Sequence, residues 1–260
     1  MDKAKKTTKK KNTNRKNNKL FRIIPLLIVL ILFAISLPFT TGDVKMVKVI
    51  KEPEIIEEVV VVEEETKGIN IKQLQEEYQN TDIIGYLEIP GVISYPIVKT
   101  DNNTYYLNHL LNHNKNIKGV PFMDYRVDFE DRKVLIYGHS GKEQDLPFLQ
   151  LHKYDEESFY KEHPTMYLYS IDNIYTYEIF SAYLEAKDYD YVNINSFRGL
   201  TWKEHIDKLK SKSNYNIPIE LTDESKILIL QTCSVEESNI GGKYKLVIGV
   251  LTNIEKNSYS

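Results

Sequence analysis

The chain contains one cysteine, Cys233, which ends an apolar run that begins at Ile227. A second apolar run, Val134 to Tyr137, is followed closely by His139. If the two runs are neighbouring strands of one sheet, their ends bring a thiol beside an imidazole, the pair that cysteine nucleophiles use. A lone cysteine can equally be a small buried hydrophobic residue, and its position alone favours neither interpretation.

The composition is that of an ordinary globular protein, except for a strongly basic N-terminal segment. The 260 residues, 42% of them hydrophobic and 27% charged, suffice for one large or two small domains. The net charge of -3 argues against a nucleic-acid partner, but residues 1–22 alone carry ten Lys or Arg and one acid. We interpret residues 1–22 as a basic tail, cytoplasmic for the reason given next. The rest of the chain is net acidic.

The segment 23–42 has no charged residue, and its first 17 residues are almost wholly apolar. It is just long enough to cross a hydrocarbon core of about 30 Å, so we expect a transmembrane anchor. The basic flank predicts a cytoplasmic N-terminus and an extracellular remainder, which is a single-pass membrane protein. A cleaved signal peptide is the alternative, but no small-x-small cleavage site follows Phe39. A free thiol exposed to oxidation outside the cell indicates that the thiol has a use.

Residues 43–68 are rich in Glu and Val and are predicted to be a stalk, 69–254 a folded catalytic domain, and 255–260 a C-terminal tail. Helical spacing of apolar residues predicts helices from Ile71 to Tyr78 and from Trp202 to Leu209, and a brief one is expected over 103–112. Strands are predicted at 85–90, 95–98, 133–137, 166–169, 175–184, 226–231 and 246–251. The fold class is therefore mainly β, a closed or nearly closed sheet with inserted helices.

Several ordered motifs then point to a family. Tyr-Gly-His ends one strand, Thr-Cys ends a later one, and a basic residue opens the last strand. In these motifs the chain resembles the sortases, which are membrane-anchored cysteine transpeptidases of Gram-positive bacteria. Further segments resemble the class B branch of that family. The resemblance covers roughly 69–251, and the segments that carry it are Ile84–Gly91, Tyr95–Val98, Tyr105–His109, Phe122–Arg126 and Phe159–Pro164.

The resemblance implies a closed eight-stranded β-barrel with the active site at one end and no cofactor. It implies that Cys233 attacks the threonine carbonyl of an Asn-Pro-x-Thr sorting signal in a secreted protein, and that His139 protonates the departing amine. An amino group of the peptidoglycan cross-bridge or its precursor would then take the acyl group. The substrate-binding residues implied are Leu107, Asn103, Thr232 and Gln231.

The chain departs from the family pattern in one important place. Members carry an arginine after the cysteine, at the head of the final strand, whereas this chain has no arginine beyond Arg198. Matching the apolar strand places Lys245 there, with Lys243 as the second candidate. We expect Lys245 to stabilise the oxyanion, as a point charge rather than as a planar fork. The first Thr of the family's Thr-Leu-x-Thr-Cys motif is Ile229, and Ser234 replaces an acid that often follows the cysteine.

Other residues could bind ligands. His109 and His113 have the spacing of zinc ligands on a helix, but no nearby acid or thiol completes a site, so no metal is predicted. The Tyr-rich stretch 189–191 could bind carbohydrate, although barrel exterior is the preferred interpretation. Asp124, Tyr125 and Arg126 could be catalytic by composition, but a structural turn with an ion pair is the preferred interpretation.

Two other function classes stay open. One is a hydrolytic cysteine peptidase or amidase, although papain-like enzymes place the cysteine before the histidine and at a helix N-terminus. The other is a non-catalytic adhesin or degenerate sortase, which the missing arginine makes conceivable. Transfer to an added amine, hydrolysis alone or no turnover of a sorting peptide separates the three.

Overall fold

The computed structural model describes residues 68–140, 146–185, 191–195, 197–233 and 243–260. The predicted basic tail, anchor and nearly all of the stalk lie outside these residues. Within the described ranges, no helix is both long enough and apolar enough to span a bilayer.

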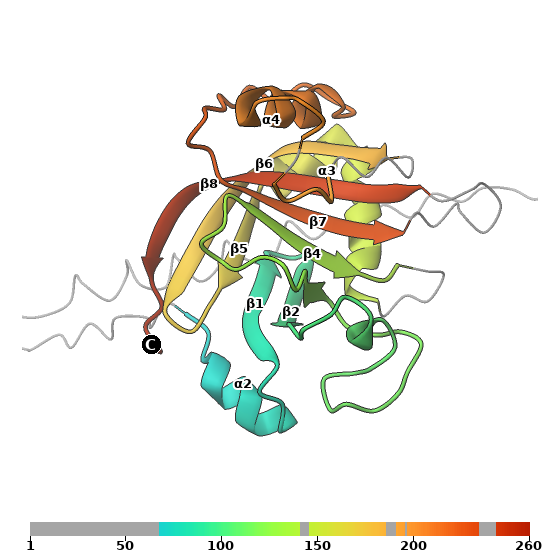
Figure 1. Ribbon diagram of the computed structural model, residues 1–260, viewed down its shortest axis with the longest axis vertical. Helices are drawn as coiled ribbons and strands as arrows, with labels where there is room; N and C mark the ends of the chain where they lie inside the picture. Colours follow the sequence, from blue (N-terminus) through green and yellow to red (C-terminus); the bar gives the residue numbers. More distant parts are fainter. Residues whose placement is uncertain (1–67, 141–145, 186–190, 196, 234–242) are drawn as a thin grey trace, which may run out of the picture. The chain divides into compact units, whose positions relative to one another are not determined.

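The described strands form a closed barrel in the order β1-β2-β3-β4-β7-β8-β6-β5 (Figure 1). The predicted mainly β, eight-stranded barrel is therefore confirmed. The strands are β1 (Ile83–Ile89), β2 (Ile93–Val98), β3 (Phe122–Met123), β4 (Lys133–Gly138), β5 (Thr165–Tyr169), β6 (Asn173–Glu185), β7 (Ile227–Cys233) and β8 (Tyr244–Lys256).

The helices connect the strands. They are α2 (Ile71–Tyr78), α3 (Glu157–Glu162) and α4 (Trp202–Ser211), with 3₁₀ segments η1 (Tyr105–Leu107) and η2 (Pro147–Asp155). Two of the expected helices are present, and local capping explains where they start. The Asn70 side chain accepts from the backbone N–H of Gln73 at the start of α2, and Thr201 and Glu204 form a capping box at the start of α4.

The helix expected over 103–112 is wrong, because only η1 forms there. The side-chain oxygen of Asn102 accepts from the backbone N–H groups of Thr104 and Tyr105, which favours a turn over a continuing helix. After η1 the chain folds back on itself, and an isolated antiparallel bridge joins His109 to Lys115. This loop leads to β3, while η1 itself forms one side of the site described below.

Strands β4 and β7 are buried on both of their faces. Inside the barrel, Val134, Ile136, Leu228 and Leu230 belong to one apolar cluster. On the outer face, a second cluster joins alternate residues of β7 and β8 to α4; its members include Ile227, Ile229, Leu246, Ile248, Trp202, Ile206 and Leu209. Burial on both faces explains why these strands are continuous apolar runs in the sequence.

The last strand is longer than the sequence predicted. β8 continues to Lys256, beyond the expected domain end at 254. Asn257, 1% exposed, then donates hydrogen bonds to the carbonyl oxygens of Ile69 and Ser170, each at 2.8 Å. These bonds fasten the chain end to the start of the described domain.

Candidate active site

The two apolar runs that precede His139 and Cys233 are neighbouring strands. β4 and β7 pair in parallel, with Tyr137 opposite Gln231 and Gly138 opposite Thr232. His139 directly follows the last residue of β4, and Cys233 is the last residue of β7, so both positions lie at the same, carboxyl-terminal edge of the sheet. The juxtaposition expected from the sequence is thus present in the backbone register.

A backbone carbonyl holds the imidazole of His139. Its Nε2 lies 2.8 Å from the carbonyl oxygen of Leu107. Because that oxygen can only accept, Nε2 carries a proton and Nδ1 is the nitrogen that can exchange one in this geometry. The last residue of η1 therefore orients the histidine that follows β4.

A pocket of about 190 Å³ lies beside His139. The lining comes from η1 and the segment before it, from β3, from the end of β4 and the residue after it, and from β7. The residues are Asn103, Leu107, Phe122, Tyr137, Gly138, His139 and Gln231. Three of the four predicted substrate-binding residues, Asn103, Leu107 and Gln231, thus share one pocket. The fourth, Thr232, is 1% exposed and does not line it.

Lys245 lies on the other face of the β7–β8 pair. It stands opposite Thr232, is fully buried, and its Nζ donates to Oδ1 of Asp155 at 2.6 Å. Burial lowers the pKa of Lys245, and the hydrogen bond and charge of Asp155 offset part of that effect. Lys245 therefore lies at the head of β8, as expected, but the ion pair holds its ammonium on the face opposite to the pocket beside His139. Lys243 is exposed and precedes β8.

An ion pair between a buried carboxylate and an exposed arginine supports the pocket wall. The expected pair of Asp124 and Arg126 is confirmed at 2.6 Å, and the Tyr137 hydroxyl donates to the same carboxylate at 2.7 Å. Burial alone would raise the pKa of Asp124, but the hydrogen bonds from Arg126 and Tyr137 outweigh it and lower that pKa. Tyr137 was not singled out in the sequence, although its position two residues before His139 on one strand was the available signal.

The two histidines with zinc-like spacing are not on a helix. The His109 ring stacks on Tyr105 with ring centroids 4.0 Å apart, and the Tyr105 hydroxyl is hydrogen-bonded to Nδ1 of His113 at 3.2 Å. Among the described residues, no three His, Cys, Asp or Glu side chains gather as a metal site. Of the Tyr-rich stretch 189–191 only Tyr191 is described, and it is 3% exposed.

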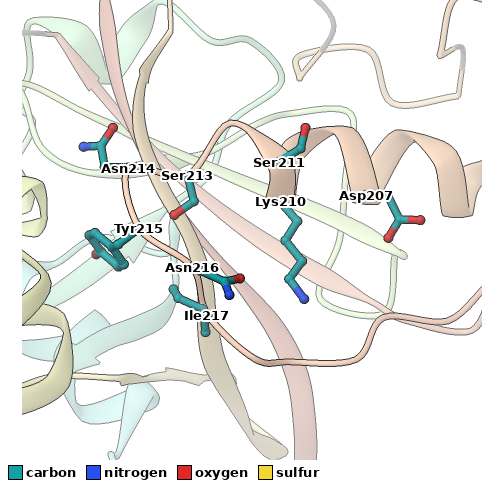
Figure 2. Close-up of a pocket in the computed structure, with 8 residues that line it drawn as sticks. All are labelled: Asp207, Lys210, Ser211, Ser213, Asn214, Tyr215, Asn216 and Ile217. Atoms are coloured by element: carbon teal, nitrogen blue, oxygen red, sulfur yellow. The ribbon is translucent and has the colours of Figure 1, made fainter.

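A larger pocket, of about 410 Å³, lies at the C-terminal end of α4 (Figure 2). It is lined by Asp207, Lys210, Ser211, Ser213, Asn214, Tyr215, Asn216 and Ile217. Lys210 donates from this region to the carbonyl oxygen of Ile219, and Asn214 donates to Asp155, so these polar groups serve the fold. The lining contains neither a histidine nor a cysteine, and the smaller pocket beside His139 is the better candidate site.

Comparison with known proteins places this geometry in a family. No protein-family model matches the chain. Over 167 residues, however, it is 32% identical to sortase B of Listeria monocytogenes, a match that covers 63% of this chain and 68% of that protein. The chain belongs to the sortase B family. It is accordingly a cysteine transpeptidase.

Solved sortase B structures share the fold. Sortase B from Listeria monocytogenes is 29% identical with a TM-score of 0.59, and the match covers 69% of this chain and 99% of that one. A sortase B complexed with triglycine is 25% identical with a TM-score of 0.61, covering 72% and 96%. The class B resemblance inferred from motifs is therefore confirmed.

Proposed function

We propose that this sortase cleaves an Asn-Pro-x-Thr type sorting signal near the C-terminus of a secreted protein and joins the new carboxyl end to an amine of peptidoglycan or its precursor. The observation that carries the proposal is the parallel register of β4 and β7, which sets the His139 and Cys233 positions side by side. The class B motifs support the signal, and a similar sortase B complexed with triglycine supports an amine acceptor.

The reaction proceeds in two acyl transfers. The Cys233 thiolate adds to the threonine carbonyl carbon and forms a C–S bond. The C–N bond to the following residue breaks as His139 gives a proton to the departing amine. The acceptor amine then adds to the thioester carbonyl and gives its proton to His139. The new C–N bond forms as the C–S bond breaks, and the thiolate is regenerated.

Leu107 links signal binding to proton transfer. The residue is 39% exposed and lines the pocket, which suits an apolar contact with the proline of the signal. Its carbonyl oxygen meanwhile accepts from His139. Asn103 accepts from the backbone N–H of Tyr125 through Oδ1 at 3.0 Å, which leaves its NH₂ group to donate to a signal carbonyl. Gln231 offers a second amide from β7.

The test is turnover of a labelled Asn-Pro-x-Thr peptide by the full-length protein in detergent, with and without triglycine. Transfer to triglycine supports the proposal. Hydrolysis that triglycine does not divert indicates a peptidase, and no turnover of any sorting peptide indicates a non-catalytic relative. Cys233→Ala is the control, and it must abolish both acyl-enzyme formation and transfer. Persistent cleavage by this variant would refute the mechanism.

We also propose that the enzyme is held at the membrane by residues 23–42, with the catalytic domain outside. The support is the uncharged segment itself and the ten basic residues that precede it. Secreted substrates and peptidoglycan amines are found outside the cell, where an extracellular catalytic domain can reach both.

A further inference from the structure

The residue opposite Cys233 on β8 is a tyrosine. In the antiparallel β7–β8 pair, Gln231 stands opposite Leu246, Thr232 opposite Lys245, and Cys233 opposite Tyr244. The β4–β7 register adds His139 on the other side. Positions 139, 233 and 244 therefore form one row across the ends of three adjacent strands.

The alternation of strand faces separates Tyr244 from Lys245. Residues directly opposite each other in an antiparallel pair share a face, and successive residues alternate. Gln231 lines the pocket beside His139, and its partner Leu246 belongs to the outer cluster under α4. Tyr244, two residues from Leu246, is on that same face and packs against this cluster. Lys245 is on the opposite face, paired with Asp155.

We propose that the Tyr244 hydroxyl donates a hydrogen bond to the oxyanion that forms when Cys233 adds to the signal's threonine carbonyl. This inference rests on the proposed function and gives Tyr244 the role first expected of Lys245. Tyrosine hydroxyls are among the side-chain donors that can form an oxyanion hole. The phenol proton stays on its oxygen throughout, so the proton balance of the two acyl transfers is unchanged.

The length of the side chain suits the role. Opposite Cα atoms in an antiparallel pair are about 4.5–5.5 Å apart. A tyrosine side chain is long, so from the position opposite 233 its hydroxyl can reach the carbonyl oxygen of a signal bound at the end of β7. A lysine one residue later lies on the other face and cannot do so without leaving its carboxylate partner, Asp155.

The surroundings of Tyr244 hold its ring and limit competing charge. The ring meets that of the buried Tyr191 edge-on, with centroids 6.5 Å apart and planes at 67°. The next position in the row, on β6, is Glu185. The carboxylate of Glu185 pairs with Lys212. The lysine charge weakens the carboxylate as an acceptor that would compete with the oxyanion for the hydrogen bond from Tyr244.

The test is Tyr244→Phe in the full-length protein, which removes the hydroxyl and keeps the ring contact. We expect kcat for acyl-enzyme formation to fall about 10²-fold, the usual cost of losing one oxyanion donor, with KM within about threefold of the wild-type value. The rate at which a methanethiosulfonate reagent modifies Cys233 is expected to stay unchanged, because thiol–disulfide exchange forms no oxyanion. Tyr183→Phe, the same change on the same face of β6, is the control and is expected to keep kcat.

Two outcomes would overturn the inference while the proposed function stands. One is a Tyr244→Phe enzyme that transfers the peptide to triglycine with kcat within a few-fold of wild type. The other is a parallel fall in kcat and in the methanethiosulfonate rate, which would mean that the hydroxyl acts on the thiol. A wild-type enzyme that turns over no sorting peptide overturns the proposed function itself.

Discussion

Replacing Lys245 by methionine is expected to weaken the fold and to leave catalysis nearly intact. The ammonium is fully buried and lies 2.6 Å from Oδ1 of Asp155, whose side chain is 43% exposed. Methionine keeps most of the buried stem and removes the charge. Asp155 is then left without its cation, but it stays in contact with water and still accepts from Asn214 at 2.9 Å.

The size of the effect follows from the difference in burial between the ammonium of Lys245 and the carboxylate of Asp155. Removing one partner of a fully buried ion pair costs about 3–5 kcal/mol, because the other charge is stranded. Here the remaining charge, on Asp155, is partly solvated. Removing the ammonium also removes the free-energy cost of its desolvation. We therefore expect a loss of about 1–2 kcal/mol in the free energy of unfolding. Lys245→Ala also removes the aliphatic stem and is expected to cost more, by about 1–2 kcal/mol, through the cavity it leaves.

Urea denaturation gives the stability of each variant, and peptide turnover below its unfolding transition gives kcat. We expect kcat of Lys245→Met within about threefold of wild type. A folded Lys245→Met protein that loses about 10²–10³ in kcat would refute this reasoning. It would return Lys245 to the oxyanion role that the sequence predicted and would weaken the case for Tyr244.

Three further outcomes are expected. His139→Gln is expected to lower turnover by at least about 10²-fold with an unchanged circular dichroism spectrum, and a loss of only a few-fold would reject proton transfer by His139. Asp124→Asn is expected to cost about 2–4 kcal/mol of unfolding free energy at neutral pH, because it disrupts the hydrogen bonds with Arg126 and Tyr137. Since the folded pKa of Asp124 is lowered, its stabilising contribution is present above the unfolded pKa of about 3.9 and is lost as pH falls through the folded value, so urea titrations of wild type and variant should converge in acid. Mass spectrometry of membrane-extracted protein is expected to find residues 1–22 still attached, whereas a mature N-terminus between Phe39 and Val44 would indicate a cleaved signal peptide.

The elements that the sequence predicted well are those whose pattern is decided by burial. β4 and β7 are covered on both faces, so their continuous apolar runs marked them as core strands. α2 and α4 expose one side and show the helical spacing that this requires. The loop after η1 has no such pattern, because the Asn102 turn and a short antiparallel bridge determine its course. Helical content was therefore overestimated there.

The placement of His139 beside Cys233 was predictable because it needs only two neighbouring strands that end together. The identity of the third group in the row was not, because it depends on register. Shifting the match of an antiparallel strand by one residue moves every side chain to the other face. Matching apolar residues to the family strand put Lys245 at the arginine position, whereas hydrogen-bonded pairing puts Lys245 opposite Thr232 and Tyr244 opposite Cys233. Lys245 was chosen because it is a cation, yet a buried cation requires an anionic partner, and Asp155 is that partner. Tyr244 is uncharged and gave no such signal, so only the register shows that it stands opposite Cys233.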